Sequence, residues 1–121
     1  MTATSSIADD RFANVDMKVQ PLAGSVHMMV GSGGNIGVSA GSDGILLVDD
    51  QYAPLAEKIS GALKGLGSEG PKYIINTHYH GDHTGSNAFF GKKQGSTIFA
   101  HENVRIRLAS GEDVDPGSLP V

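Results

Sequence analysis

The chain has no cysteine and no tryptophan among its 121 residues. The absence of cysteine excludes a disulfide framework, a zinc site built on thiolates and a catalytic thiol. No stretch approaches the roughly 20 consecutive apolar residues that span a bilayer, so no membrane segment is predicted. Only 18% of the residues are charged, and the formal net charge is −4. Because no cluster of Lys and Arg is present, nucleic acid is not expected as a partner.

Glycine, in contrast, is abundant at 17 residues, and apolar residues make up 39% of the chain. This composition is typical of one small globular domain that is rich in loops. We expect residues 1–15 to form a flexible lead-in, residues 16–110 the domain, and residues 111–121 a tail. The start lacks the basic and apolar segments of a signal peptide, which predicts a cytoplasmic protein; a mature exported chain would look the same.

Short extended runs separated by Gly, Ser and Asp predict an antiparallel meander. The runs are residues 17–20, 25–30, 35–40 and 45–49. Part of the last run, residues 45–48, reads Ile-Leu-Leu-Val without alternation. A continuously apolar strand is typically covered on both faces, so helices are expected beside the sheet.

The second part of the chain predicts a strand, a helix and a strand in succession. Residues 54–66 have apolar side chains at helical spacing and a proline in the first turn. Residues 72–76 then read as the next buried strand, which the right-handed crossover rule makes parallel to the strand before the helix. A further strand is predicted at residues 97–100 and a short helix at residues 102–109. The fold class is therefore mixed α/β, or α+β.

Strongly coordinating side chains gather in residues 77–85, directly after the second predicted buried strand. This segment reads Thr-His-Tyr-His-Gly-Asp-His-Thr-Gly and holds three of the five histidines. Residues two apart on an extended segment point the same way, so His78 and His80 can present their imidazoles to one ion. A kink at Gly81 can turn Asp82 and His83 toward a second ion.

Neutral imidazoles with one carboxylate form a ligand set typical of zinc, and iron or manganese would also accept it. Two such ions about 3.5–4 Å apart can share a hydroxide that is nucleophilic at neutral pH. The same pair of ions can hold a scissile carbonyl or phosphoryl group. The motif therefore indicates metal-assisted hydrolysis.

Residues 77–83 resemble the His-x-His-x-Asp-His signature of the metallo-β-lactamase-fold hydrolases. Residues 44–49 resemble that family's strand ending in Asp, and residues 74–77 resemble its approach to the motif. Residues 84–87 resemble the continuation into a helix. The resemblance covers roughly residues 17–109 and implies zinc as the cofactor, with two ions in the complete domain and iron or manganese as alternatives.

Carried over residue by residue, the resemblance implies that His78 and His80 bind the first metal ion. It implies that Asp82 and His83 bind the second, and that Asp82 is also the catalytic residue that handles the proton of the bridging water. Asp49 is expected to orient the ligand loop through hydrogen bonds, as carboxylates near metal ligands commonly do. The alternative for Asp49 is an ordinary strand-end residue facing a turn.

The family fold is an αββα sandwich of two similar halves, and the second half supplies further metal ligands. After His83 the sequence has one histidine, His101, which is expected to open the helix at residues 102–109; His27 is a weak candidate ligand. The chain is thus expected to be the N-terminal half of a longer domain, truncated before the second half, with one apolar sheet face exposed. The alternative is a short protein that forms a homodimer or pairs with another chain.

The function expected on these grounds is hydrolysis of a small-molecule ester, lactam, thioester or phosphoester by a metal-bound hydroxide. One alternative is oxygenase-type chemistry at iron. Another is an inactive fragment or metal-binding module that holds one weak ion through His78 and His80. Residues 31–35, Gly-Ser-Gly-Gly-Asn, form either a mobile flap over the site or a plain hairpin turn.

Overall fold

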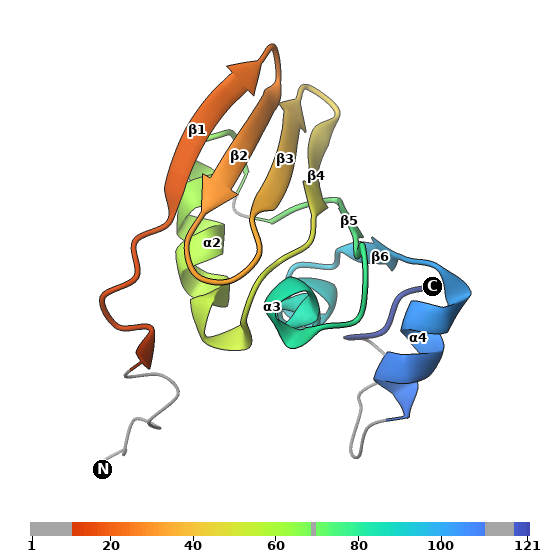
Figure 1. Ribbon diagram of the computed structural model, residues 1–121. Coiled ribbons are helices and arrows are strands. Elements are labelled where there is room, and N and C mark those ends of the chain that lie inside the picture. Colours follow the sequence, from red (N-terminus) through yellow and green to blue (C-terminus); the bar gives the residue numbers. More distant parts are fainter. Residues whose placement is uncertain (1–10, 69, 111–117) are drawn as a thin grey trace.

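The computed structural model describes residues 11–68, 70–110 and 118–121. In this part of the chain a six-stranded mixed sheet has helices packed against it (Figure 1). The strands are β1 (Lys18–Ala23), β2 (Val26–Val30), β3 (Ile36–Gly41), β4 (Gly44–Val48), β5 (Tyr73–Ile75) and β6 (Thr97–Phe99). The helices are α2 (Ala56–Lys64), α3 (Gly81–Thr84) and α4 (Glu102–Ala109), with a 3₁₀ turn η1 (Ala53–Leu55) and a π-helical turn η2 (Phe89–Lys93).

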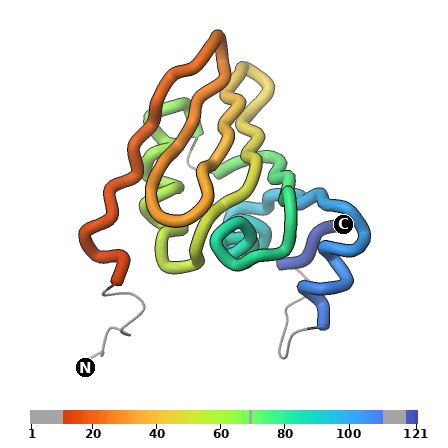
Figure 2. The backbone as a smooth tube through the Cα atoms, viewed as in Figure 1, coloured from red at the N-terminus to blue at the C-terminus, as the bar shows by residue number. Residues whose placement is uncertain are grey.

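The strands lie in the sheet in the order in which they occur along the chain. Strands β1 to β4 pair antiparallel, whereas β4, β5 and β6 pair parallel. The predicted meander and the predicted parallel strand, helix, strand unit are therefore both confirmed, and Figure 2 traces the backbone through both of them. Because β4 and β5 are parallel, their carboxyl ends lie at the same edge of the sheet.

Local sequence explains where these elements begin and end. The β3–β4 hairpin turns through Gly44, whose φ of 115° is open to glycine but not to other residues. The helix predicted at residues 54–66 begins as the turn η1, where Pro54 needs no amide partner, and ends at Lys64. The bounds of α4 agree with the prediction at residues 102–109.

One face of the sheet carries the hydrophobic core. Alternate strand residues such as Leu47, Ile74 and Ile98 point to this face, and α2 packs on it through Ile59 and Leu63. In Figure 1 this helix lies behind the strands. Burial of these side chains stabilises the fold by about 1.5–3 kcal/mol for each large aliphatic residue, before the entropy cost of folding.

The opposite face of the sheet is open and apolar. Val48, Ile75 and Phe99 are register partners across β4, β5 and β6, so they share this face. Ile75 and Phe99 are 39% and 42% exposed. Since Leu46 and Val48 are only half-buried, the prediction that β4 is covered on both faces is wrong for the described residues. The sequence also predicted one exposed apolar sheet face, and the face that carries Ile75 and Phe99 confirms it.

The two ends of the described chain both pack on the domain. Phe12 is 4% exposed and lies in the core, and the Lys58 ammonium donates to the backbone carbonyl of Phe12 at 2.9 Å and to that of Val15 at 2.6 Å. These contacts place residues 11–15 against the domain before β1, and residues 1–10 lie outside the described part. The flexible lead-in expected over residues 1–15 stays a prediction.

At the other end, the Val121 amide donates to the Ile98 carbonyl at 2.8 Å, so the chain lies beside β6. Most of the expected tail, residues 111–117, lies outside the described residues. No helix in the described ranges is long and apolar enough to cross a membrane.

Candidate metal centre

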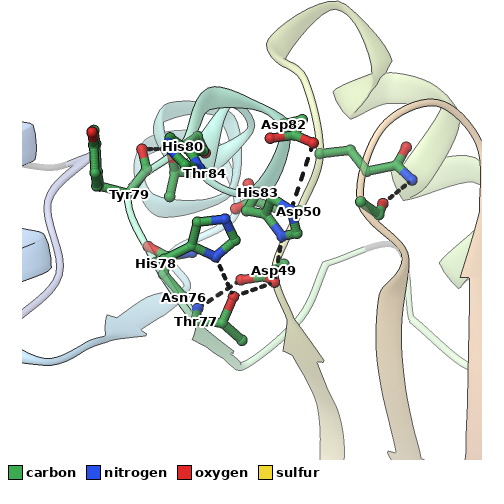
Figure 3. A network of polar contacts seen from close by, with 12 residues as sticks. Asp49, Asp50, Asn76, Thr77, His78, Tyr79, His80, Asp82, His83 and Thr84 are labelled. Atoms are coloured by element: carbon green, nitrogen blue, oxygen red, sulfur yellow. Dashed lines mark hydrogen bonds and ion pairs between the residues drawn. The ribbon is translucent and has the colours of Figure 1, made fainter.

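The His/Asp segment lies at the edge of the sheet where β4 and β5 end (Figure 3). The Asp49 amide donates to the Ile75 carbonyl at 2.8 Å, which extends the pairing of the two strands by one step. The chain after β5 then passes through Asn76, which is buried and bonded by its side chain to that of Asn87 at 2.8 and 3.2 Å. The segment therefore starts from a fixed point in the core.

Asp49 is the central hydrogen-bond acceptor of the site. It is 4% exposed, and its φ of 67° turns the chain sharply at the end of β4. The Thr77 amide donates to Oδ1 at 2.7 Å, and the Thr77 hydroxyl donates to Oδ2 at 2.7 Å. Nδ1 of His83 lies 2.7 Å from Oδ2. These contacts join the end of β4 to both ends of the histidine segment.

The hydrogen bonds define which nitrogen each ring presents outward. A carboxylate only accepts, so Nδ1 of His83 carries the hydrogen that it donates to Asp49. The single hydroxyl proton of Thr77 also goes to Asp49, so at His78 the hydroxyl accepts from Nδ1 at 2.8 Å. In the neutral rings of His78 and His83 the electron pair is therefore on Nε2, the atom left for a metal.

The five predicted site residues come together around these two rings. The ring centre of His78 lies 4.0 Å from that of His83 and 4.9 Å from that of His80. Oδ2 of Asp82 lies 3.6 Å from Nε2 of His83. One donor atom each from Asp49, His78 and His83 lie within 4.8 Å of one another, a spacing that could hold an ion.

The contacts of Asp49 favour a positioning role over direct coordination. Its oxygens already accept from Thr77 and His83 at distances of 2.7 Å. Asp82 is half-buried, and its carboxylate has no hydrogen bond among the described residues. The donor set that fits a metal ion is thus made of imidazoles and the Asp82 carboxylate, which are the ligand types that zinc accepts.

The short helix α3 holds Asp82 and His83 after the extended part of the segment. Amides of His83 and Thr84 donate to the His80 carbonyl at 3.0 and 3.2 Å, and the Thr84 hydroxyl donates to it at 3.1 Å. The predicted change of direction is present, but it does not depend on glycine. Gly81 has no positive φ, and a Cβ there would meet nothing within 4 Å.

A second buried carboxyl group, Asp50, lies beside the site. Burial raises the pKa of Asp50 well above its usual range, the hydrogen bond from the Ser86 amide opposes this rise, and the charge of Asp49 adds to it. Oδ1 accepts from that amide at 3.0 Å, whereas Oδ2 has no partner among the described residues. The Asp50 amide donates to the His83 carbonyl at 3.0 Å, so Asp50 supports the ligand segment from behind.

The loop between β2 and β3 packs directly on the site. A Cβ on Gly33 would lie 2.7 Å from Cβ of Asp82, and a Cβ on Gly34 would fall within the His83 ring. Close approach of this loop therefore requires glycine at both positions. Residues 31–35 therefore lie over the site, which is the position that the flap interpretation requires. The choice between a mobile flap and a plain hairpin turn stays a prediction.

The two remaining histidines of the described chain take no part in the cluster. His101 accepts a hydrogen bond on Nδ1 from the Asn103 amide at 3.0 Å, which caps α4 as the sequence predicted. His27 is on β2, and its Nδ1 lies 3.2 Å from the Ser25 carbonyl oxygen. Sequence reasoning missed Thr77 as the link between Asp49 and His78, although its hydroxyl stands next to the first histidine.

A sheet of this topology with a His/Asp cluster at its β4–β5 edge defines a metallo-β-lactamase-type fold. The profile of the family described as the Metallo-beta-lactamase superfamily matches residues 22–118. The chain belongs to this superfamily. A comparison with curated protein sequences gave no match.

Solved structures agree with this assignment. The subclass B3 metallo-β-lactamase BJP-1 of Bradyrhizobium japonicum is 25% identical with a TM-score of 0.69, over 82% of this chain and 38% of that protein. The Rm3 metallo-β-lactamase is 28% identical with a TM-score of 0.71, over 93% of this chain and 42% of that protein. The di-zinc B3 enzyme LRA-12 from an Alaskan soil metagenome, at 24% identity and a TM-score of 0.71, is similar in fold. The chain spans about two fifths of the length of these proteins.

Proposed function

We propose that this chain provides half of a dizinc centre of a hydrolase. His78 and His80 would hold one zinc ion, and Asp82 and His83 the other. Asp49 positions the ligand segment through Thr77 and His83. Membership of the superfamily and the grouping of these side chains support the proposal.

One observation carries this proposal. Nε2 of His83 and Oδ2 of Asp82 lie 3.6 Å apart, and each is an electron-pair donor when the ring is neutral. Two such atoms repel one another unless a cation lies between them. A proton on Nε2 or a metal ion would satisfy both atoms, and a neutral imidazole with a carboxylate is a ligand pair that zinc accepts.

The chemistry proposed is cleavage of an ester, lactam, thioester or phosphoester in a small-molecule substrate. Zinc bound there would polarise the scissile group and lower the pKa of a water molecule. In this chain, Asp82 has a free carboxylate oxygen at the site and is the proposed acceptor of the proton from that water. A β-lactam is among the candidate substrates, because the structural neighbours at 25–28% identity are described as metallo-β-lactamases.

The remaining ligands are proposed to come from polypeptide packed on the open sheet face. Val48, Ile75 and Phe99 line that face, and it meets the edge at which Asp49 and the histidine segment lie. Either a second half of the same domain or a second copy of this chain would cover these side chains. The cytoplasmic location expected from the sequence stays a prediction.

Metal content tests the proposal directly. The 121-residue chain is purified without an affinity tag or added metal, analysed for bound elements, and then titrated with zinc. We expect His80→Ala to lower zinc binding at least tenfold with an unchanged far-UV spectrum, because this exposed ring lies outside the core and contacts rings of its own segment, those of His78 and Tyr79. His101→Asn is the matched control, since it removes a histidine but keeps a residue that caps α4.

The outcomes separate the alternatives. Close to two zinc ions per chain would indicate that a second copy completes the site, and well under one would indicate that the chain holds only half of it. Equal zinc binding by wild type and His80→Ala would contradict the proposal. Bound iron in place of zinc would favour oxygenase-type chemistry instead. Turnover of a chromogenic β-lactam or ester that survives Asp82→Ala would remove Asp82 from the mechanism.

A further inference from the structure

Gln51 is fully buried next to the site, although it belongs to no proposed ligand set. Its side-chain Nε2 donates to the Gly34 carbonyl at 2.6 Å, and Oε1 accepts from the Ser32 amide at 3.3 Å. Both partners are backbone groups of the β2–β3 loop, residues 31–35. One side-chain amide thus satisfies a donor and an acceptor of this loop, which is the pattern expected of a clamp rather than of a chance contact.

The backbone of Gln51 adds a second attachment. Its φ of 54° lies in the left-handed region, which non-glycine residues rarely adopt unless surrounding contacts hold them there. Its carbonyl accepts from the Gly85 amide at 2.7 Å, directly after α3. A Cβ on Gly85 would lie 2.6 Å from this oxygen, so the approach needs glycine. Gln51 therefore joins the end of β4, the β2–β3 loop and the end of α3.

The loop that Gln51 holds is in direct contact with two proposed ligands. The Gly33 backbone lies against the side chain of Asp82, and the Gly34 backbone lies against the His83 ring. No side chain intervenes, so the position of the loop limits the rotamers open to both residues. If the loop moved away, the His83 ring would keep its hydrogen bond to Asp49 but would lose its contact with the Gly34 backbone.

We propose that Gln51 is a positioning residue, which clamps the β2–β3 loop onto Asp82 and His83 and so orients them for metal binding. This inference rests on the proposed metal site. It makes residues 31–35 a fixed wall of that site rather than a freely moving flap. Loss of groups that orient metal ligands typically lowers metal affinity by about 10–100-fold, and an effect of this size is expected here.

The test compares Gln51→Met, which keeps the length of the side chain but removes both hydrogen bonds, with wild type and with Gln94→Met. Gln94 lies between η2 and β6 and is half-buried beside Gly70. Gly70 precedes β5 and is therefore away from the carboxyl end of that strand, so Gln94 is a matched control. Amide hydrogen exchange of residues 31–35 is measured on the metal-free chain by mass spectrometry. Zinc affinity is measured separately by competition with a chromogenic chelator.

We expect Gln51→Met to speed exchange in the loop at least severalfold and to weaken zinc binding at least tenfold, with Gln94→Met unchanged in both. If Gln51→Met fails to fold, Gln51→Glu serves, because it keeps the acceptor for the Ser32 amide and loses the donor to Gly34. Gly34→Ala leaves Gln51 in place but drives a methyl group into the His83 ring, and should also weaken zinc binding.

Unchanged exchange in the loop of Gln51→Met would overturn the clamp. Faster exchange with unchanged zinc affinity would overturn the positioning role, while the clamp would stand as a structural contact only. If wild type itself binds no zinc, the proposed function is wrong, and the exchange rates alone then decide whether Gln51 holds the loop.

Discussion

Replacement of Asp49 by asparagine tests the link between the end of β4 and the ligand segment. Asn is nearly isosteric and tolerates the left-handed φ of 67° found here, so the substitution adds no backbone strain. It keeps one acceptor oxygen, which can still take the Thr77 amide. The other oxygen, which accepts from the Thr77 hydroxyl and from Nδ1 of His83, becomes an amide nitrogen.

The magnitude follows from those contacts. Each hydrogen bond to a charged group contributes about 1.5–3 kcal/mol, and Asp49→Asn removes two of them. Thr77 is exposed and His83 is half-buried, so water can replace part of the loss. We therefore expect the free energy of unfolding to fall by about 2–4 kcal/mol, a large share of the 5–15 kcal/mol typical of a domain.

Urea unfolding followed by circular dichroism measures this change, and zinc titration measures its consequence for the site. Zinc affinity should fall about 10–100-fold, because the His83 ring is no longer held by Nδ1. Asp43→Asn is the control, since Asp43 is exposed on the β3–β4 turn and should change stability by less than about 0.5 kcal/mol. A loss of under about 1 kcal/mol in Asp49→Asn, with unchanged zinc binding, would refute this account of Asp49.

Three further predictions follow from burial, exposure and capping. Burial raises the pKa of Asp50 above the value of 3.8 that an unperturbed Asp has, so the folded protein binds the proton more tightly than the unfolded chain does. The free energy of unfolding should therefore fall as pH rises from 3.8 toward the raised pKa. Asp50→Asn should remove this fall in urea titrations from about pH 4 to about pH 8. If a second copy of the chain covers the open sheet face, wild type should self-associate in sedimentation experiments, and Ile75→Lys with Phe99→Lys should reduce this without loss of helix signal, because both side chains lie on that face. Self-association that is equal in wild type and the double variant would place the contact elsewhere. His101→Ala should cost about 1 kcal/mol in thermal unfolding and His101→Asn should restore it, whereas equal stability would show that the α4 cap is unimportant.

The fold could be predicted from the sequence because its signals are local. Turn residues separate the strands of the meander, and helical spacing of apolar residues gives α2. The incorrect expectation, cover on both faces of β4, has the same origin. The continuous run at residues 45–48 indicates that both faces of β4 are apolar. It does not indicate whether other described residues pack on both of these faces. They pack on one face only.

The candidate site likewise has one part that the sequence predicts and one part that it does not. The spacing of His78, His80, Asp82 and His83 within six residues is a strong local pattern, and the structure brings their side chains together. The contacts of Gln51 could not be found in this way. Its partners in the β2–β3 loop lie 17 and 19 positions away in the chain, and no local periodicity links residues at that separation.

The end of β4 organises the site through three consecutive residues. Asp49 bonds Thr77 and His83, Asp50 bonds the backbone at His83 and Ser86, and Gln51 bonds the β2–β3 loop and Gly85. Ordinary strand geometry would send alternate side chains to opposite faces of the sheet. The left-handed φ at Asp49 and again at Gln51 breaks this alternation, so all three residues reach groups around one site. Their partners are protein groups held by a core on the other side of the sheet, so the fold itself fixes the path of the histidine segment.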